Sequence, residues 1–126
     1  MEPTIILETP EYLILNKPAG LMVHGDGKKD VMTLSDWIIS KYPELKNVGE
    51  PVTFDDKEIV RPGIVHRLDE DTSGVIIVTK NQNSFEYFKK LFMDRNIQKE
   101  YHAFVWGHLK EQNGIINEPI GRNKND

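Results

Sequence analysis

The chain has 126 residues, 38% of them hydrophobic and 9% aromatic, which suits one compact domain and excludes a protein that is disordered by composition. Its 16 basic and 20 acidic side chains give a formal net charge of -4, which argues against binding of nucleic acid through a uniformly basic surface but leaves room for a local basic groove. The absence of cysteine excludes disulfides and thiolate metal sites.

Hydropathy along the chain indicates no membrane segment. The apolar runs are far shorter than the roughly 20 residues that cross a bilayer. The N-terminus shows no basic segment followed by an apolar one, as a secretory leader would. We therefore expect a cytoplasmic protein.

Two short apolar runs come first and predict neighbouring strands. They cover residues 5–7 and 12–16, and a proline turn lies between them. Residues 25–30 then form a polar, glycine-rich loop. After that loop Thr33 can cap an amphipathic helix, which we expect to end before Pro43.

The second half of the chain predicts further elements. Residues 44–61 mix proline, glycine and charge without a period and are interpreted as a long loop. An apolar strand follows at residues 75–78, and then a helix over residues 81–95. Alternating side chains predict a strand at residues 99–107, and residues 114–116 could start another.

This order of elements predicts an α+β (mixed α/β) fold. We expect a largely antiparallel sheet with flanking helices, formed by residues 1–126 as one domain. The polar segment after residue 122 ends the pattern abruptly, so the sheet could lack its continuation.

The most informative segment is residues 66–74, HRLDEDTSG, which places a histidine, an arginine and an acid cluster on a loop between ordered elements. Asp69 is the leading catalytic candidate. An ion pair with Arg67 would keep its carboxylate ionised and oriented, and an aspartate can then act as nucleophile or base without a cofactor. The same acids also fit a solvated acidic turn, which is the commoner situation for charged residues.

Other functions of the same residues are less well supported. His66, Asp69 and Ser73 are the residue types of a hydrolase triad, but triad members usually come from distant segments, and the chain has no Gly-x-Ser-x-Gly motif. The histidines do not follow the spacing of a metal motif, and no glycine-rich segment matches a nucleotide-binding fingerprint. We therefore expect no metal and no cofactor.

Aromatic and basic residues near residue 100 leave two interpretations open. Tyr101 could pack on a sheet or could offer a stacking surface to a planar substrate. Nearby basic residues could form a stripe beside it or simply a solvated helix face; they are Lys89, Lys90, Arg95 and Lys99.

The spacing HRLDxxTSG at residues 66–74 resembles the signature loop of RluA-type pseudouridine synthases. Supporting stretches follow in the expected order. Residues 12–20 resemble the family's first strand and its Lys-Pro-x-Gly turn, and residues 61–65 resemble the lead-in to the catalytic loop. Residues 99–107 resemble the strand that bears the active-site tyrosine, and residues 119–122 match a further turn.

The resemblance implies isomerisation of uridine to pseudouridine in ribosomal or transfer RNA, without cofactor or metal. By position, Asp69 would be the essential aspartate, which either attacks the uridine or removes a ribose proton as the glycosidic bond breaks. Tyr101 would stack on the target base. Arg67 would occupy the space left by the flipped nucleotide and contact the RNA backbone.

Four further residues receive roles from the same resemblance. His66 and Thr72 would line the RNA side of the loop, and Lys17 and Arg122 would belong to the turns that support it. A non-catalytic RNA-binding module of the same fold is the alternative. An unrelated hydrolase that uses His66 and Asp69 is a third interpretation.

The family's catalytic domain is longer than this chain and continues into a later basic motif that pairs with the aspartate. We therefore expect residues 1–126 to be the N-terminal half of that domain, truncated at its C-terminus and without a separate N-terminal RNA-binding domain. Little or no activity is expected of the chain alone. Open strand edges would invite self-association.

Overall fold

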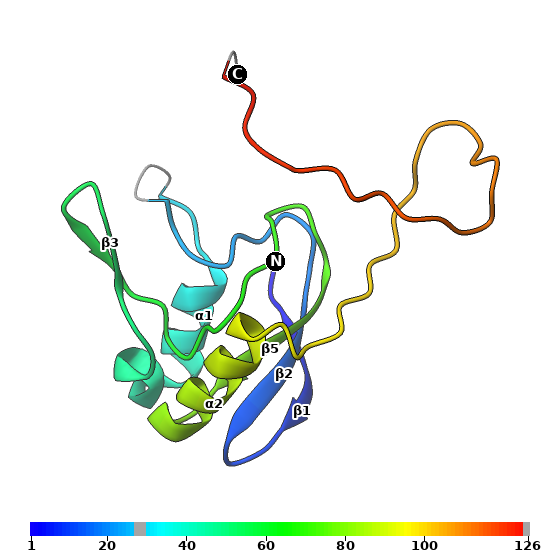
Figure 1. Ribbon diagram of the computed structural model, residues 1–126. Helices are drawn as coiled ribbons and strands as arrows, with labels where there is room; N and C mark the ends of the chain where they lie inside the picture. The colour runs from blue at the N-terminus through cyan, green and yellow to red at the C-terminus, as the bar shows by residue number, and fades with distance from the viewer. Residues whose placement is uncertain (27–29, 125–126) are drawn as a thin grey trace.

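A computed structural model describes residues 1–26 and 30–124, so the predicted polar loop at residues 25–30 lies partly outside the described residues. At the centre is a three-stranded antiparallel sheet in the order β1-β2-β5 (Figure 1). Its strands are β1 (Thr4–Glu8), β2 (Tyr12–Lys17) and β5 (Gly74–Thr79). The three strands predicted from apolar runs and the antiparallel sheet are confirmed.

Two capped helices flank the sheet, α1 (Leu34–Lys41) and α2 (Gln82–Met93). The Thr33 hydroxyl accepts the backbone N–H of Asp36 at 3.3 Å, and the Asp36 carboxylate accepts the backbone N–H of Thr33 at 2.8 Å. Asn81 caps α2 by accepting the N–H of Ser84 at 2.9 Å. Both predicted helix starts are confirmed, because these capping signals are local in sequence. α2 ends two residues before the predicted position 95, where Arg95 has a positive φ of 56°.

The helices pack on opposite faces of the sheet. Leu13 and Leu15 of β2 lie opposite Val78 and Ile76 of β5, and all four are fully buried against α1 in the main core. Successive strand residues point to opposite faces, so Tyr12 faces the other way. Its ring meets Phe88 of α2 edge to face, with centroids 5.5 Å apart. None of the helices described is long and apolar enough to span a bilayer.

The predicted long loop at residues 44–61 is wrong in part. It contains a short 3-10 helix η1 (Pro43–Asn47) and a hairpin of β3 (Val52–Phe54) and β4 (Lys57–Ile59). The hairpin turn places Asp55 and Asp56 at positive φ values of 48° and 59°. Aspartate tolerates this conformation, but the usual sequence signal for such a turn includes glycine, which is why the hairpin was missed.

The predicted strands at residues 99–107 and 114–116 are wrong. Both stretches run irregularly away from the body, as the yellow-to-red part of Figure 1 shows. Phe104 and Trp106 are fully exposed. Alternation of side chains indicates a strand only if a neighbouring strand supplies hydrogen bonds, and in the described residues none pairs with these stretches.

Candidate active site

The lead-in to the loop at residues 66–73 is tied to the end of β5. The Gly63 N–H donates to the Val48 carbonyl at 2.8 Å, and the Gly63 carbonyl accepts both the N–H and the hydroxyl of Thr79, each at 2.9 Å. Gly63 has a φ of +63°, and a Cβ there would lie 2.1 Å from the Thr79 carbonyl oxygen. Only glycine fits, so the entry to the loop has a fixed position.

His66 fixes the first residue of the loop. Its Nε2 accepts the backbone N–H of Ile77 at 3.0 Å, and its ring stacks on Phe92 with centroids 4.4 Å apart and planes 16° from parallel. Burial, with a smaller contribution from the charge of Lys99, lowers the pKa of His66 to about 4. The ring is therefore neutral at pH 7, and its proton sits on Nδ1 because Nε2 accepts a hydrogen bond.

Lys17 is hydrogen-bonded to the middle of the loop. Its side chain is fully buried, and Nζ donates to the carbonyls of Pro18 at 3.0 Å, Leu21 at 2.7 Å and Glu70 at 3.0 Å. The Glu70 carbonyl also accepts the Gly20 N–H at 2.8 Å. Burial lowers the pKa of Lys17, and the three acids at positions 69–71 oppose that shift. The turn after β2 is thus joined to a loop 53 residues away in sequence.

The loop presents Asp69 and Arg67 to solvent. Leu68 between them is buried, with 7% of its surface exposed, and both flanking side chains are exposed. The Asp69 carbonyl accepts the Thr72 N–H at 3.1 Å, which closes a turn over the acids. The expected ion pair between Arg67 and Asp69 is not among the ion pairs of the described residues.

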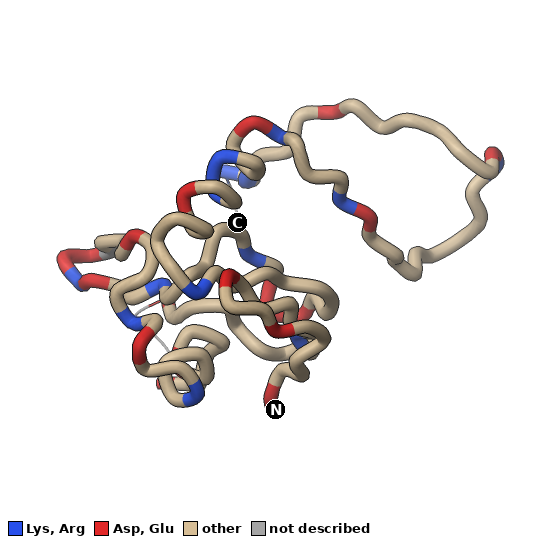
Figure 2. The backbone as a smooth tube through the Cα atoms, turned by 90° about the horizontal axis from the view of Figure 1, so that it is seen from below, with Lys and Arg blue, Asp and Glu red and all other residues tan. Residues whose placement is uncertain are grey.

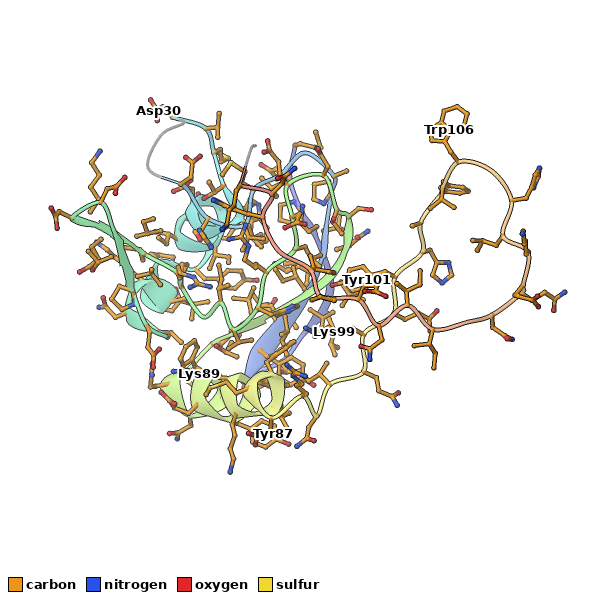
Figure 3. All side chains as sticks on the ribbon, turned by 45° about the horizontal axis from the view of Figure 1, so that its top comes forward. Asp30, Tyr87, Lys89, Lys99, Tyr101 and Trp106 are labelled. Atoms are coloured by element: carbon orange, nitrogen blue, oxygen red, sulfur yellow. The ribbon has the colours of Figure 1, made fainter. Side chains whose placement is uncertain are left out.

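A cavity of about 730 Å³ opens beside this loop, between the outer edge of β5 and α2. Its apolar walls include Val75, Ile77, Phe88 and Phe92. The Lys99 ammonium lies 5.6 Å from the Phe92 ring centroid. In Figure 3, Lys99 and Tyr101 lie together where the extended segment leaves the body, whereas Trp106 lies far out on its loop.

Some of the predicted site residues come together at this cavity and others do not. His66, Thr72 and Tyr101 line it, and Tyr101 is 62% exposed. Asp69 and Arg67 lie on the same loop but outside the lining, and Lys17 is buried beneath them. Arg122 lies exposed in the irregular C-terminal segment, and it takes part in none of the ion pairs of the described residues.

Sequence reasoning missed other polar residues near the loop. Asp71 lines the cavity, and its place in the acid cluster was the only signal for it. Burial lowers the pKa of both His24 and Arg61, and the charge of Arg67 lowers both further. Arg61 opens the stretch at residues 61–65 that resembles the lead-in to the loop, but neither residue gave a chemical signal of its own. Within the described residues, no group of three histidines or acids could hold a metal.

Comparison with known proteins gives one consistent family. Residues 11–126 match the family model described as RNA pseudouridylate synthase. The chain is 35% identical over 97% of its length to an RNA pseudouridine synthase of Synechocystis and 32% identical over its whole length to YlyB of Bacillus subtilis. It is 39% identical over 96% of its length to ribosomal large subunit pseudouridine synthase D of Buchnera aphidicola. It covers 35%, 39% and 35% of these relatives, so it spans little more than a third of their length.

Proposed function

We propose, because the chain belongs to the RNA pseudouridylate synthase family, that it supplies the catalytic aspartate of an enzyme that isomerises uridine in RNA. The predicted RluA-type resemblance is confirmed, since the relatives include proteins named ribosomal large subunit pseudouridine synthase D. Ribosomal RNA is accordingly the first substrate to test, and transfer RNA the second. The main support for the proposal is the position of Asp69. It is exposed on a loop that is held by the contacts of Gly63, His66 and Lys17, and this loop adjoins a cavity of about 730 Å³.

The chemistry needs a flipped nucleotide and one carboxylate. A uridine leaves its stack at a cost of a few kcal/mol and enters the cavity, where Tyr101 stacks on the base. Asp69 then attacks the nucleoside or removes a ribose proton as the bond between N1 and C1′ breaks. The uracil turns and C5 bonds to C1′. The carboxylate is released from the nucleoside, or the abstracted proton returns to the ribose. N1 takes a proton from solvent, and the proton on C5 leaves to solvent. No co-reactant is consumed.

The remaining residues position the reacting groups. Arg67 fills the space left by the flipped nucleotide and contacts the RNA backbone, while Thr72 lies on the cavity side of the loop. His66 and Lys17 hold the loop through the contacts described above. Arg122 belongs to a turn that supports the site when RNA is bound.

The test is tritium release from RNA labelled at uridine C5. The chain, its Asp69→Asn variant and an Asp94→Asn control at the end of α2 are compared, alone and within any longer protein that contains them. We expect little or no release from the chain alone. In the longer protein we expect release that Asp69→Asn abolishes and Asp94→Asn preserves. Release that survives Asp69→Asn would overturn the assignment of the aspartate.

A non-catalytic RNA-binding module is the second candidate. It is favoured by one observation, that Asp69 lies outside the lining of the cavity beside its loop. RNA affinity that persists in Asp69→Ala, with no turnover by the longer protein, would support it. Either function requires contact with ribosomal or transfer RNA. We therefore propose that the protein acts in the cytoplasm.

We also propose self-association through exposed strand edges. β1 is exposed along its whole length, and Ile5, Ile6 and Leu7 are 45%, 57% and 48% exposed. A long exposed edge with apolar side chains can pair with another chain. Light scattering should show a mass that rises with concentration, and a constant monomer mass would count against this proposal.

A further inference from the structure

His66 leaves one ring nitrogen unused beside the cavity. Its ring lines that cavity, and its Nε2 accepts the backbone N–H of Ile77 at 3.0 Å. Among the described residues Nδ1 has no hydrogen-bond partner, and it is not one of their buried atoms that lack a partner. Solvent therefore reaches Nδ1, in a ring that forms part of the cavity wall.

The backbone fixes the tautomer of His66. A peptide N–H can only donate, so Nε2 must be the acceptor and the proton of the neutral ring must sit on Nδ1. Burial keeps the ring neutral at pH 7, since it lowers the pKa of His66 to about 4. The tautomer of a histidine is set by the hydrogen bond that its other nitrogen makes, so Nδ1 of His66 stays a donor.

The orientation of the His66 ring is fixed as well. The ring stacks on Phe92 of α2, with centroids 4.4 Å apart and planes 16° from parallel. The apolar side chains of Val75, Ile77 and Phe88 line the same cavity. Against such walls a hydrogen bond is stronger than in water, and a donor left without an acceptor costs more. Nδ1 is therefore well placed to discriminate between ligands that enter the cavity.

Selection of one base requires a contact with the edge of that base. Basic and acidic positions are interspersed along the backbone in Figure 2, and contacts with phosphates carry no information on base identity. Uracil and cytosine differ at position 4, where uracil has the acceptor oxygen O4 and cytosine has an amino group that donates. A group that can only donate attracts the first and repels the second.

We propose that the Nδ1–H of His66 donates to O4 of the flipped uridine and thereby selects uridine over cytidine. The inference rests on the proposed function, since it takes RNA as the ligand and the cavity as the place of the base. A histidine without a fixed tautomer could accept from the cytosine amino group through an unprotonated Nδ1. The hydrogen bond from Ile77 prevents this, so the discrimination depends on the fold around the ring.

The same donor suits the substrate and the product. To exchange N1 for C5 at the ribose, the uracil makes a half turn about the line through N3 and C6. That turn also exchanges the two carbonyl groups, so O2 of pseudouridine takes the place that O4 had in uridine. His66 thus binds a carbonyl oxygen before and after the turn, and no covalent bond of its own changes.

The first test measures binding of the chain to two single-stranded RNAs that differ only in one central nucleotide, uridine or cytidine. We expect the unmodified chain to prefer uridine about tenfold, because cytidine leaves the donor unpaired. His66→Phe keeps a ring against Phe92 and removes the donor, so the preference should disappear. His108→Phe makes the same change at an exposed histidine outside the cavity lining and should preserve it. A preference that survives His66→Phe, or none in the unmodified chain, would overturn the proposal.

A second measurement uses the unmodified chain, because His66→Phe also removes the acceptor of the Ile77 N–H. NMR follows the His66 ring nitrogens and the Tyr101 ring during addition of the monophosphates of uridine, pseudouridine and cytidine. The Nδ1 signal should shift with the first two and not with the third. A Tyr101 shift with uridine but no Nδ1 shift would refute the role of His66 alone. If no nucleotide shifts either signal, the base does not enter the cavity and the proposed function falls as well.

Discussion

Replacing Lys17 with methionine should weaken the whole fold because this ammonium is the link between two segments of the site. Its Nζ is fully buried and donates to three backbone carbonyls, those of Pro18, Leu21 and Glu70. Methionine has a similar length and fills the same space without a donor. The substitution therefore removes the hydrogen bonds and the charge while it preserves much of the packing.

The size of the stability loss in Lys17→Met depends on which carbonyls lose their hydrogen-bond donor. The Glu70 carbonyl keeps the Gly20 N–H at 2.8 Å, so it stays satisfied. The Leu21 and Pro18 carbonyls lose Nζ, and an unsatisfied buried acceptor costs about 1–3 kcal/mol. Pro18 is partly accessible to water, which reduces its share. We expect a loss of about 3 kcal/mol, or about 2 M in the urea midpoint at a slope of about 1.5 kcal/mol/M.

Urea unfolding followed by circular dichroism measures this loss, with Lys89→Met as the matched control. The Lys89 ammonium lies 2.6 Å from the Glu50 carboxylate, but solvent reaches both side chains and screens the pair, so its removal should cost much less than the loss of Lys17. Hydrogen exchange of the Gly20 amide should accelerate in Lys17→Met alone. Equal midpoints for the two variants would refute the reasoning, since the buried ammonium would then contribute no more than an exposed one.

Two further substitutions test other anchors of the loop. The pKa of His66 is about 4 in the folded chain against 6.5 in the unfolded chain, so the unfolded chain takes up a proton first as the pH falls. The contribution of His66 to the free energy of unfolding is complete above pH 6.5 and should be smaller by about 2 kcal/mol at pH 5. Urea unfolding at both pH values should show this loss in the unmodified chain and a smaller one in His66→Gln; equal losses would assign it to other groups. Gly63→Ala should cost several kcal/mol, because its Cβ would lie 2.1 Å from the Thr79 carbonyl at a φ of +63°. Gly114→Ala, whose Cβ meets nothing within 4 Å, is its control in thermal unfolding, and similar melting temperatures would contradict the strain argument.

The fold was predictable where the signal is local in sequence. Thr33 and Asn81 mark the starts of both helices, because a capping side chain reaches only two or three residues along the chain. The strands at residues 12–16 and 75–78 were also predictable, since each is apolar and finds its partner in the other. The side chains of residues 99–107 alternate just as regularly, but no strand of the described residues pairs with them. Their alternation therefore does not produce a strand.

The site was predictable only as far as its central loop. The spacing of residues 66–74 identified Asp69 and Arg67 as candidates, but no pattern in the sequence indicates that Lys17 is fully buried beneath them. Lysine is rarely buried, and only the three carbonyls that surround Nζ explain this case. The partial burial of Arg61 was likewise unpredictable, because it depends on how residues 44–61 fold.

The position of His66 bears on the hydrolase alternative. A base in a triad must offer a free nitrogen lone pair to the nucleophile. The Nε2 lone pair already accepts the Ile77 N–H at 3.0 Å, and Nδ1 then carries the proton. Freeing Nε2 would leave the Ile77 N–H without its partner and would break the stack on Phe92. His66 is therefore a poor base, and the hydrolase alternative lacks the residue on which it depends.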